Sequence, residues 1–197
     1  MRLRRHVGGQ CNGTGGESPF FIHMPINIAQ DHFSLFGLPS AYALDAVSLE
    51  RSYRGIQARI HPDKFVNAGE AEKRASLQWT TRVNDAYRTL KDPVLRARYL
   101  LEQAGLDVGF ETNTAMPPAF LMRQLELREA LEDATDEAAL DALAGQLTKD
   151  RQRLEAILAA KIDGEKDLPA AVGTVRELQF LSRFGEEISA AYEAMEK

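Results

Sequence analysis

The fold of the first half of this chain depends on the stretch Ile60-His61-Pro62-Asp63-Lys64-Phe65. Proline disfavours helical backbone in the residue before it, so a helix that reaches Ile60 must end there. Upstream, four apolar residues recur at the helical spacing i, i+4, i+7 and i+11, after a candidate N-cap at Asp45. These residues are Leu49, Tyr53, Ile56 and Ile60. The sequence therefore predicts a helix that ends at Ile60, followed by a loop that runs to Gly69.

A second long helix is predicted after this loop, from about Glu70 to Leu90. Its apolar stripe consists of Trp79, Val83, Ala86 and Leu90. Lys91-Asp92-Pro93 then interrupts the pattern, because proline cannot continue a helix. Two long helices joined by a short loop form a helical hairpin, with the loop at its tip. Shorter helical patterns flank the hairpin near residues 32–38 and 94–101.

Three further helical patterns follow near residues 118–134, 137–161 and 168–195. Five leucines share one face of the middle pattern: Leu140, Leu143, Leu147, Leu154 and Leu158. We expect Asp163-Gly164 to separate the middle helix from the last. Three amphipathic helices with short connections predict an antiparallel bundle. No alternating strand pattern bounded by turn residues occurs, so the predicted fold class is all-α.

Charge divides the chain into two parts. The 197 residues are 44% hydrophobic and carry a net charge of −5. Residues 25–104 have eleven basic against nine acidic groups, whereas residues 105–197 have ten against nineteen. This asymmetry predicts two modules with partners of different sign. The small positive excess of the first module is too weak to predict nucleic-acid binding.

The remaining composition excludes several classes of protein. Cys11 is the only cysteine, which excludes an intrachain disulfide framework and a Cys-rich zinc site and favours a reducing cytoplasm. No apolar run approaches the roughly 18 to 20 residues of a membrane span, so no membrane association is expected. A catalytic pair of His61 and Asp63 would need another positioned group and a water-excluding pocket. The other histidines, His6, His23 and His32, show no metal-ligand spacing.

Residues 31–102 resemble a J domain, the module with which J-type co-chaperones engage a DnaK-type ATP-driven chaperone. The resemblance rests on Tyr53 and Arg54 in the first long helix, on the loop and on the end of the second long helix. The matching loop is His61-Pro62-Asp63-Lys64, and the helix end contains Asn84-Asp85-Ala86-Tyr87, Leu90 and Asp92-Pro93.

Four segments more narrowly resemble the HscB family, the J proteins dedicated to iron–sulfur cluster assembly. Three lie in the first module: Phe33–Pro39, His61–Phe65 and Arg96–Leu101. The fourth, Phe120–Glu129, is similar to the first bundle helix of HscB. The resemblance implies a co-chaperone and not an enzyme, with no catalytic residue, cofactor or metal.

The resemblance also implies a surface for an HscA-like chaperone. Its loop residues are His61, Pro62, Asp63 and Lys64, and its basic helix residues are Arg51, Arg54 and Arg59. Pro62 fixes its own φ, and the Asp63 carboxylate can accept a bidentate bond from a partner arginine. Taken alone, the arginines are equally consistent with an ordinary solvated helix face.

A second implied surface lies on the bundle and binds an IscU-type scaffold protein. The matching positions are Leu121, Met122, Leu125, Glu126, Glu129, Asp133 and Phe180. Helical spacing places Phe120, Leu127 and Leu131 on one face, with the apolar residues 121, 122 and 125 opposite, among acidic residues. Burial preference alone leaves it open whether Leu121 and Leu125 pack on a neighbouring helix. Phe180 lies at the edge of the last helix's stripe and, without the resemblance, is expected in the core.

We therefore predict four segments. They are a disordered N-terminal extension at 1–28, a J domain at 29–104, a linker at 105–117 and a scaffold-binding bundle at 118–197. The expected function is stimulation of the ATPase of an HscA-like chaperone and delivery of the IscU-type scaffold to it. A general J-domain co-chaperone for unfolded clients is the alternative.

Overall fold

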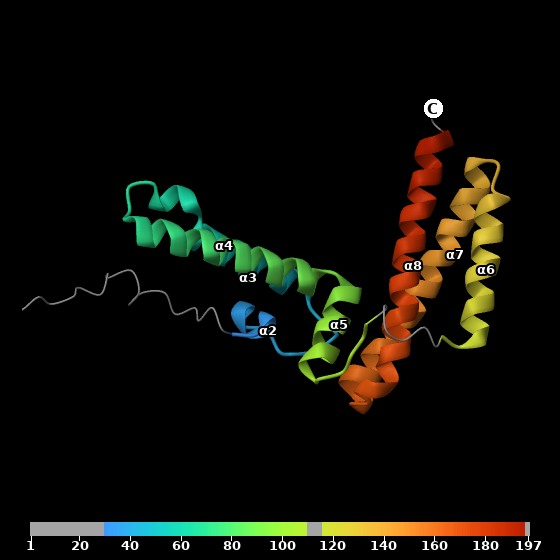
Figure 1. The fold of residues 1–197 in the computed structure, drawn as a ribbon, viewed down its shortest axis with the longest axis horizontal. Coiled ribbons are helices and arrows are strands. Elements are labelled where there is room, and N and C mark those ends of the chain that lie inside the picture. Colours follow the sequence, from blue (N-terminus) through green and yellow to red (C-terminus); the bar gives the residue numbers. More distant parts are fainter. Residues whose placement is uncertain (1–29, 110–115, 196–197) are drawn as a thin grey trace, which may run out of the picture.

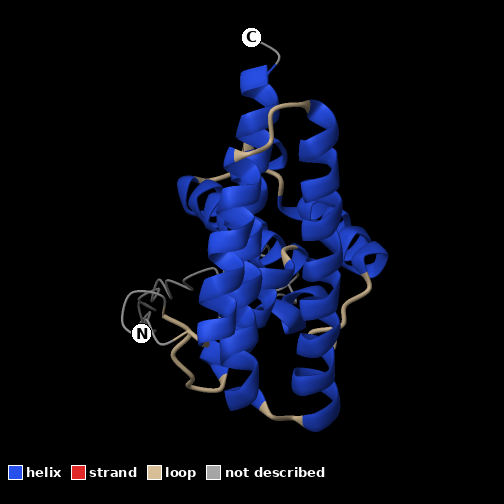
Figure 2. Ribbon diagram, turned by 90° about the vertical axis from the view of Figure 1, so that its right-hand side faces the viewer, coloured by secondary structure: helices blue, strands red, loops and turns tan. Residues whose placement is uncertain are grey.

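The computed structural model describes residues 30–109 and 116–195, and helices dominate both ranges. In chain order the elements are α2 (His32–Phe36), α3 (Ala46–Ile60), the 3-10 turn η1 (Pro62–Phe65), α4 (Glu70–Lys91), α5 (Pro93–Gln103), α6 (Pro118–Glu132), α7 (Glu137–Ala159), the π-helical turn η2 (Ala160–Glu165) and α8 (Leu168–Met195). Figure 2 shows helix and loop throughout these ranges and no strand. The hairpin of α3 and α4 projects to one side of a bundle of α6, α7 and α8 (Figure 1). The predicted all-α fold, a helical hairpin with short flanking helices joined to a three-helix bundle, is confirmed.

The hairpin forms where the sequence predicts it. The Asp45 carboxylate caps α3 by accepting a hydrogen bond from the Val47 N–H at 3.0 Å. The helix ends at Ile60, whose carbonyl accepts a 2.6 Å bond from the buried Ser76 hydroxyl of α4. Five residues of the predicted stripes are fully buried between the helices: Leu49, Ile60, Val83, Ala86 and Leu90.

The bundle buries one apolar stripe from each of its helices. Its core includes Phe120, Leu127, Leu140, Leu147, Leu154, Leu158, Leu181, Phe184 and Ile188. The break between α7 and α8 falls later than the predicted Asp163-Gly164, because η2 continues through both residues. The chain leaves the helix at Lys166, with a positive φ of 58°. The Lys161 ammonium holds this corner by donating to the Ala170 carbonyl at 2.8 Å.

Asp163 instead joins the two modules. Its carboxylate accepts hydrogen bonds from the backbone N–H groups of Tyr42, at 2.9 Å, and Ala43, at 2.7 Å. The Tyr42 ring is buried beneath the Arg96 guanidinium of α5, 5.1 Å from the ring centroid. Desolvation by burial raises the pKa of Tyr42 and lowers that of Arg96. The base of α8 packs along α5 at this junction (Figure 1).

The beginning of the predicted linker packs against the folded modules. Gly105 closes α5 with a φ of 77°, a value that glycine adopts without steric cost. The Leu106 N–H then donates to the Leu101 carbonyl at 3.0 Å, and Val108 is fully buried. Residues 110–115 of the linker and the predicted extension at 1–28 lie outside the described residues. The division into domains stays a prediction.

Two negative findings concern the described residues alone. None of their helices is long and apolar enough to cross a membrane. Within 30–109 and 116–195, no group of three or more His, Cys, Asp or Glu side chains is placed to hold a metal ion.

His32 links α2 to the hairpin through a buried, neutral imidazole. Its ring stacks on Tyr99 with centroids 4.1 Å apart, and its Nε2 lies 2.8 Å from Nη1 of Arg82. An arginine can only donate, so Nε2 is the acceptor and the proton sits on Nδ1. Desolvation, and then the Arg82 charge, hold the pKa of His32 below its ordinary value, and the carboxylates of Asp31 and Asp85 oppose them less strongly.

Acid is therefore expected to weaken the first module through His32. Because the folded state resists protonation of this ring, the unfolded state binds more protons below about pH 6.5, the ordinary pKa of histidine, and stability falls as the pH drops through that value. His32→Phe keeps the stacking ring and removes the titration. Urea titrations at pH 7.5 and at pH 5.5 measure the free energy of unfolding. Its decrease from the higher to the lower pH should be larger for the parent than for the variant. Equal losses would contradict this role.

Candidate partner-binding surfaces

The tip of the hairpin presents His61 and Asp63 to solvent. Pro62 starts η1, and the His61 Nδ1 accepts a 3.3 Å bond from the Asp63 backbone N–H. The Asp63 side chain is 86% exposed and lies 3.4 Å from the same imidazole nitrogen. Phe65 is buried beneath the turn and anchors it to the hairpin. The loop thus holds an accessible carboxylate on a fixed turn.

A polar and aromatic cluster stabilises the hairpin on the flank that carries Arg54. The Tyr53 and Tyr87 rings stack with centroids 3.9 Å apart. Glu50 accepts hydrogen bonds from the Tyr87 hydroxyl and, at 2.6 Å, from Arg54 Nε. These bonds hold the pKa of Glu50 below its ordinary value, so it stays ionised. Asn84 of α4 completes the cluster by accepting a 3.0 Å bond from the Tyr53 hydroxyl.

The four predicted basic residues of the hairpin are exposed but are not equivalent. Arg51 and Arg54 line a shallow depression on α3, and Arg54 is paired with Glu50 there. Arg59 lies at the exposed end of α3, beside the loop that carries Lys64. The structure thus distributes the four cations from the start of α3 to the tip of the hairpin.

The predicted apolar patch on α6 faces solvent. Leu121, Met122 and Leu125 are 49%, 59% and 50% exposed, while Leu127 on the opposite face is buried. Burial preference alone did not decide whether Leu121 and Leu125 pack on a neighbouring helix. Their exposure shows that they do not pack in the bundle core. We call Leu121, Met122 and Leu125 the α6 patch.

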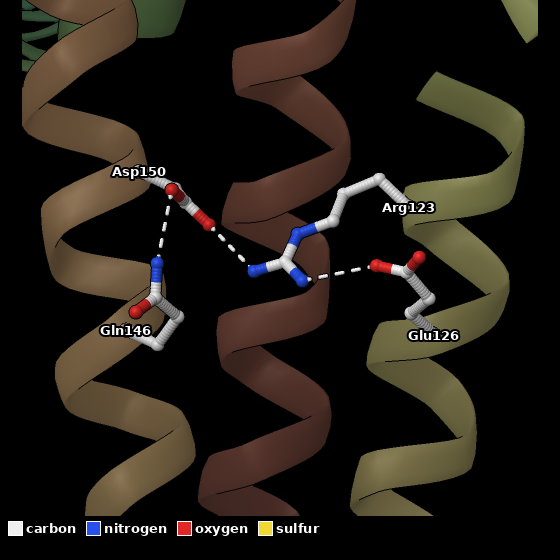
Figure 3. A network of polar contacts seen from close by, with 4 residues as sticks. All are labelled: Arg123, Glu126, Gln146 and Asp150. Atoms are coloured by element: carbon white, nitrogen blue, oxygen red, sulfur yellow. Dashed lines mark hydrogen bonds and ion pairs between the residues drawn. The ribbon is translucent and has the colours of Figure 1, made fainter. Parts of the chain in front are cut away.

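The acidic residues predicted around the α6 patch continue along the same face of α6. Glu126 is paired with Arg123 at 3.2 Å, and Arg123 also reaches Asp150 of α7 at 3.0 Å (Figure 3). These bonds raise the pKa of Arg123. Glu129 follows one turn later, and Asp133 is the C-cap of α6, about 18 Å from residue 121 at 1.5 Å per residue. The structure places all these residues on one stripe, not in one compact cluster.

Phe180 belongs both to the core and to the surface. Its ring meets Phe120 edge-on, with centroids 5.6 Å apart, and stacks on Phe184 at 6.0 Å. Its side chain remains half-buried between α6 and α8. The ring contacts agree with the core position expected from the stripe, and the scaffold contact implied by the resemblance stays a prediction.

Comparison with known proteins agrees with these two modules. A family model described as the HSCB C-terminal oligomerisation domain matches residues 116–189. A co-chaperone protein HscB homolog from Bordetella pertussis is 52% identical over 164 residues, which cover 83% of this chain and 96% of that protein. The chain belongs to the HscB family of co-chaperones.

Solved structures show the same arrangement in other members of the HscB family. Chaperone HscB from Vibrio cholerae is 35% identical, with a TM-score of 0.75 over 84% of this chain and 99% of that one. Human co-chaperone protein HscB is 27% identical, with a TM-score of 0.81 over 84% of each chain. The hairpin module is accordingly a J domain.

Sequence reasoning missed several features of these surfaces. Val47 is exposed in the depression beside Arg51 and Arg54. Two further apolar residues are also exposed: Val66, the C-cap of η1, and Leu77 on α4. The exposure of Val47 could have been predicted from the sequence, because this apolar residue lies outside the apolar stripe of its helix. No sequence signal marks the Arg123–Asp150 bridge, because it joins residues on different helices.

The α6 patch should contribute little to the stability of this HscB-family fold. We expect Met122→Ala combined with Leu125→Ala to change the free energy of unfolding by less than about 1 kcal/mol, since exposed side chains leave no cavity. Leu127→Ala, on the buried face of the same helix, should cost about 2 to 5 kcal/mol. Urea unfolding of both variants measures the contrast, and a larger loss in the double variant would show that the patch packs in the core.

Proposed function

We propose that this chain stimulates the ATPase of an HscA-like, DnaK-type chaperone and delivers an IscU-type scaffold protein to it during iron–sulfur cluster assembly. The observation that carries the proposal is the exposed Asp63 carboxylate on the 3-10 turn at the hairpin tip. A carboxylate presented in this way can form a bidentate, charge-assisted pair with an arginine of the chaperone. The single cysteine continues to favour a reducing cytoplasm as the compartment.

No bond chemistry is proposed for the tip of the J domain. His61 and Asp63 are both exposed, whereas general acid–base catalysis needs a positioned group in a site that excludes water. The chain instead supplies binding energy to one conformational state of the chaperone. A ligand shifts such an equilibrium only by its difference in affinity for the two states.

The basic side chains of α3 support docking on an acidic surface of the chaperone. Arg51, Arg59 and Lys64 are exposed, and the pairing of Arg54 with Glu50 fixes its guanidinium on the outside of the helix. Charges of this kind mainly accelerate encounter and orient the two proteins. They are weakened by salt, because they lie in solvent.

The α6 patch supports binding of the scaffold. Three adjacent exposed apolar side chains, bordered by the acidic residues of the same stripe, have the composition of an interface centre with a polar rim. The patch lies on a different module from Asp63, so the chain can contact both partners at once. The Asp163 bonds to the loop before α3 hold the two modules together during this contact.

Loss of the Asp63 charge should abolish stimulation of the chaperone. Asp63→Asn removes the charge that a partner arginine recognises, while the Asp63 backbone bond to His61 is retained. We expect single-turnover ATP hydrolysis by the chaperone to return to its unstimulated rate. The thermal midpoint of the variant should match that of the parent, since the side chain is exposed.

Asp85→Asn is the matched control for this experiment. It removes one carboxylate from α4 of the same hairpin, where Asp85 pairs with Arg88 at 2.8 Å. Normal stimulation is expected from it. Full stimulation by Asp63→Asn would overturn the proposed role of the loop.

The α6 patch should carry the affinity for the scaffold. Met122→Ala combined with Leu125→Ala should weaken binding by a few kcal/mol, on the order of typical interface hot spots. Calorimetric titration with an IscU-type scaffold measures this loss. Basal stimulation of the chaperone by the J domain should remain, and only the additional effect of the scaffold should be lost.

Leu95→Ala controls for the loss of exposed apolar surface in general. Leu95 is exposed on α5, outside the α6 patch. Equal affinities for the double variant and the control would reject the patch as the scaffold site. A parent that binds unfolded polypeptides but no folded scaffold would indicate a general J-domain co-chaperone instead.

A further inference from the structure

Arg176 of α8 is a buried cation for which the described part of the chain provides no compensating charge. Its residue surface is 8% exposed, and its buried Nε has no hydrogen-bond partner. Within 30–109 and 116–195, no carboxylate forms an ion pair with its guanidinium. A buried donor that is left without a hydrogen-bond acceptor costs free energy. This position is therefore costly for the isolated bundle.

Arg176 lines a cavity of about 160 Å³ in the groove between α6 and α8. The cavity is open to solvent on one side, and its lining contains no acidic side chain. The lining residues are Met116, Gln124, Arg176, Gln179, Phe180 and Arg183. Two cations and two carboxamides thus surround a space with apolar walls of a methionine and a phenylalanine.

The cavity borders the α6 patch. Gln124 lies on α6 between Leu121 and Leu125, on the flank of the helix that faces α8. Phe180 forms a wall of the cavity and also packs edge-on against Phe120 beneath the patch. A protein bound on the α6 patch would therefore cover the mouth of the cavity.

The chemistry of the lining selects one class of ligand. Guanidinium groups bind carboxylates through short, charge-assisted bonds, and carboxamides donate further hydrogen bonds. The apolar walls suit the methylene stem of an acidic side chain. The acidic stripe of Glu126, Glu129 and Asp133 lies farther along α6, so the cavity is a local cationic site beside an otherwise acidic surface.

We propose that the cavity is a specificity site that receives a carboxylate side chain of the protein bound on the α6 patch. The proposal rests on the proposed function, which makes that protein an IscU-type scaffold. The Arg176 guanidinium has no carboxylate partner in the free bundle and gains one in the complex. An acidic stripe alone would attract any basic protein, whereas this site requires an acidic group at one defined place.

The test compares two substitutions of Arg176 in the full chain. Arg176→Met removes the charge and retains an apolar stem, and Arg176→Lys retains the charge. Calorimetric titration with an IscU-type scaffold should show at least a tenfold loss of affinity for Arg176→Met and a smaller loss for Arg176→Lys. The thermal midpoint of Arg176→Met should equal or exceed that of the parent, because an uncompensated buried charge has been removed.

Lys149→Gln is the matched control, since it removes one positive charge from an exposed position of α7 outside the cavity. It should bind the scaffold as the parent does. Single Asp→Asn and Glu→Gln variants of the scaffold then identify the carboxylate. One of these scaffold variants should bind the parent more weakly than the unaltered scaffold does. The same scaffold variant should bind Arg176→Met as tightly as the unaltered scaffold does, because a double-mutant cycle then assigns the lost affinity to this pair.

The outcomes separate this inference from the proposed function. Scaffold affinity of Arg176→Met within twofold of the parent, or equal losses in the Met and Lys variants, would overturn the carboxylate site while leaving the α6 patch intact. A lower thermal midpoint with unchanged affinity would make Arg176 a structural residue. Absence of scaffold binding by the parent itself would overturn the proposed function, and the carboxylate site with it.

Discussion

The structure of the first module depends on how the chain leaves α3. Pro62 prevents the helix from continuing, and a helix end leaves carbonyl groups without partners. The Ile60 side chain is fully buried there, so water cannot satisfy its carbonyl, and the Ser76 hydroxyl does so instead. This bond fixes the register of α4 against α3. It also determines that the next residues, His61 to Asp63, lie outside the core at the tip of the hairpin.

A second constraint fixes the modules relative to each other. The Asp163 carboxylate accepts hydrogen bonds from two backbone N–H groups of the loop before α3. Tyr42 is buried beside it and Arg96 is half-buried, with the guanidinium over the ring. The surface on the hairpin and the surface on α6 are thus held in one arrangement. Under the proposed function such contacts between the modules favour binding of a second partner, because less conformational freedom is then lost.

The two surfaces use electrostatics differently. On α3 the cations are exposed, and even the paired Arg54 remains in solvent, which suits a transient and salt-sensitive encounter. Beyond the α6 patch the acidic residues continue along one stripe of α6, and Arg176 lies buried on the neighbouring α8. A buried cation contributes affinity only after a partner has replaced its lost hydration. Under the proposed function, the bundle surface selects its partner and the hairpin surface accelerates the encounter with the chaperone.

The sequence alone determined the helices, their stripes and the loop, because proline, caps and apolar periodicity act over a few residues. The stripes of α3 and α4 and the helix end at Ile60 were predictable in this way, as was the opposite placement of Leu127 and the α6 patch. Only the tertiary structure decided which residues outside the main stripes meet a neighbouring helix, so the exposure of Leu121 and Leu125 and the half-burial of Phe180 could not be derived beforehand. The Asp163 contacts and the buried Arg176 join residues that are distant in the chain, or depend on a space enclosed by two helices. Local sequence pattern carries no information about such contacts, since they arise from the packing of whole elements.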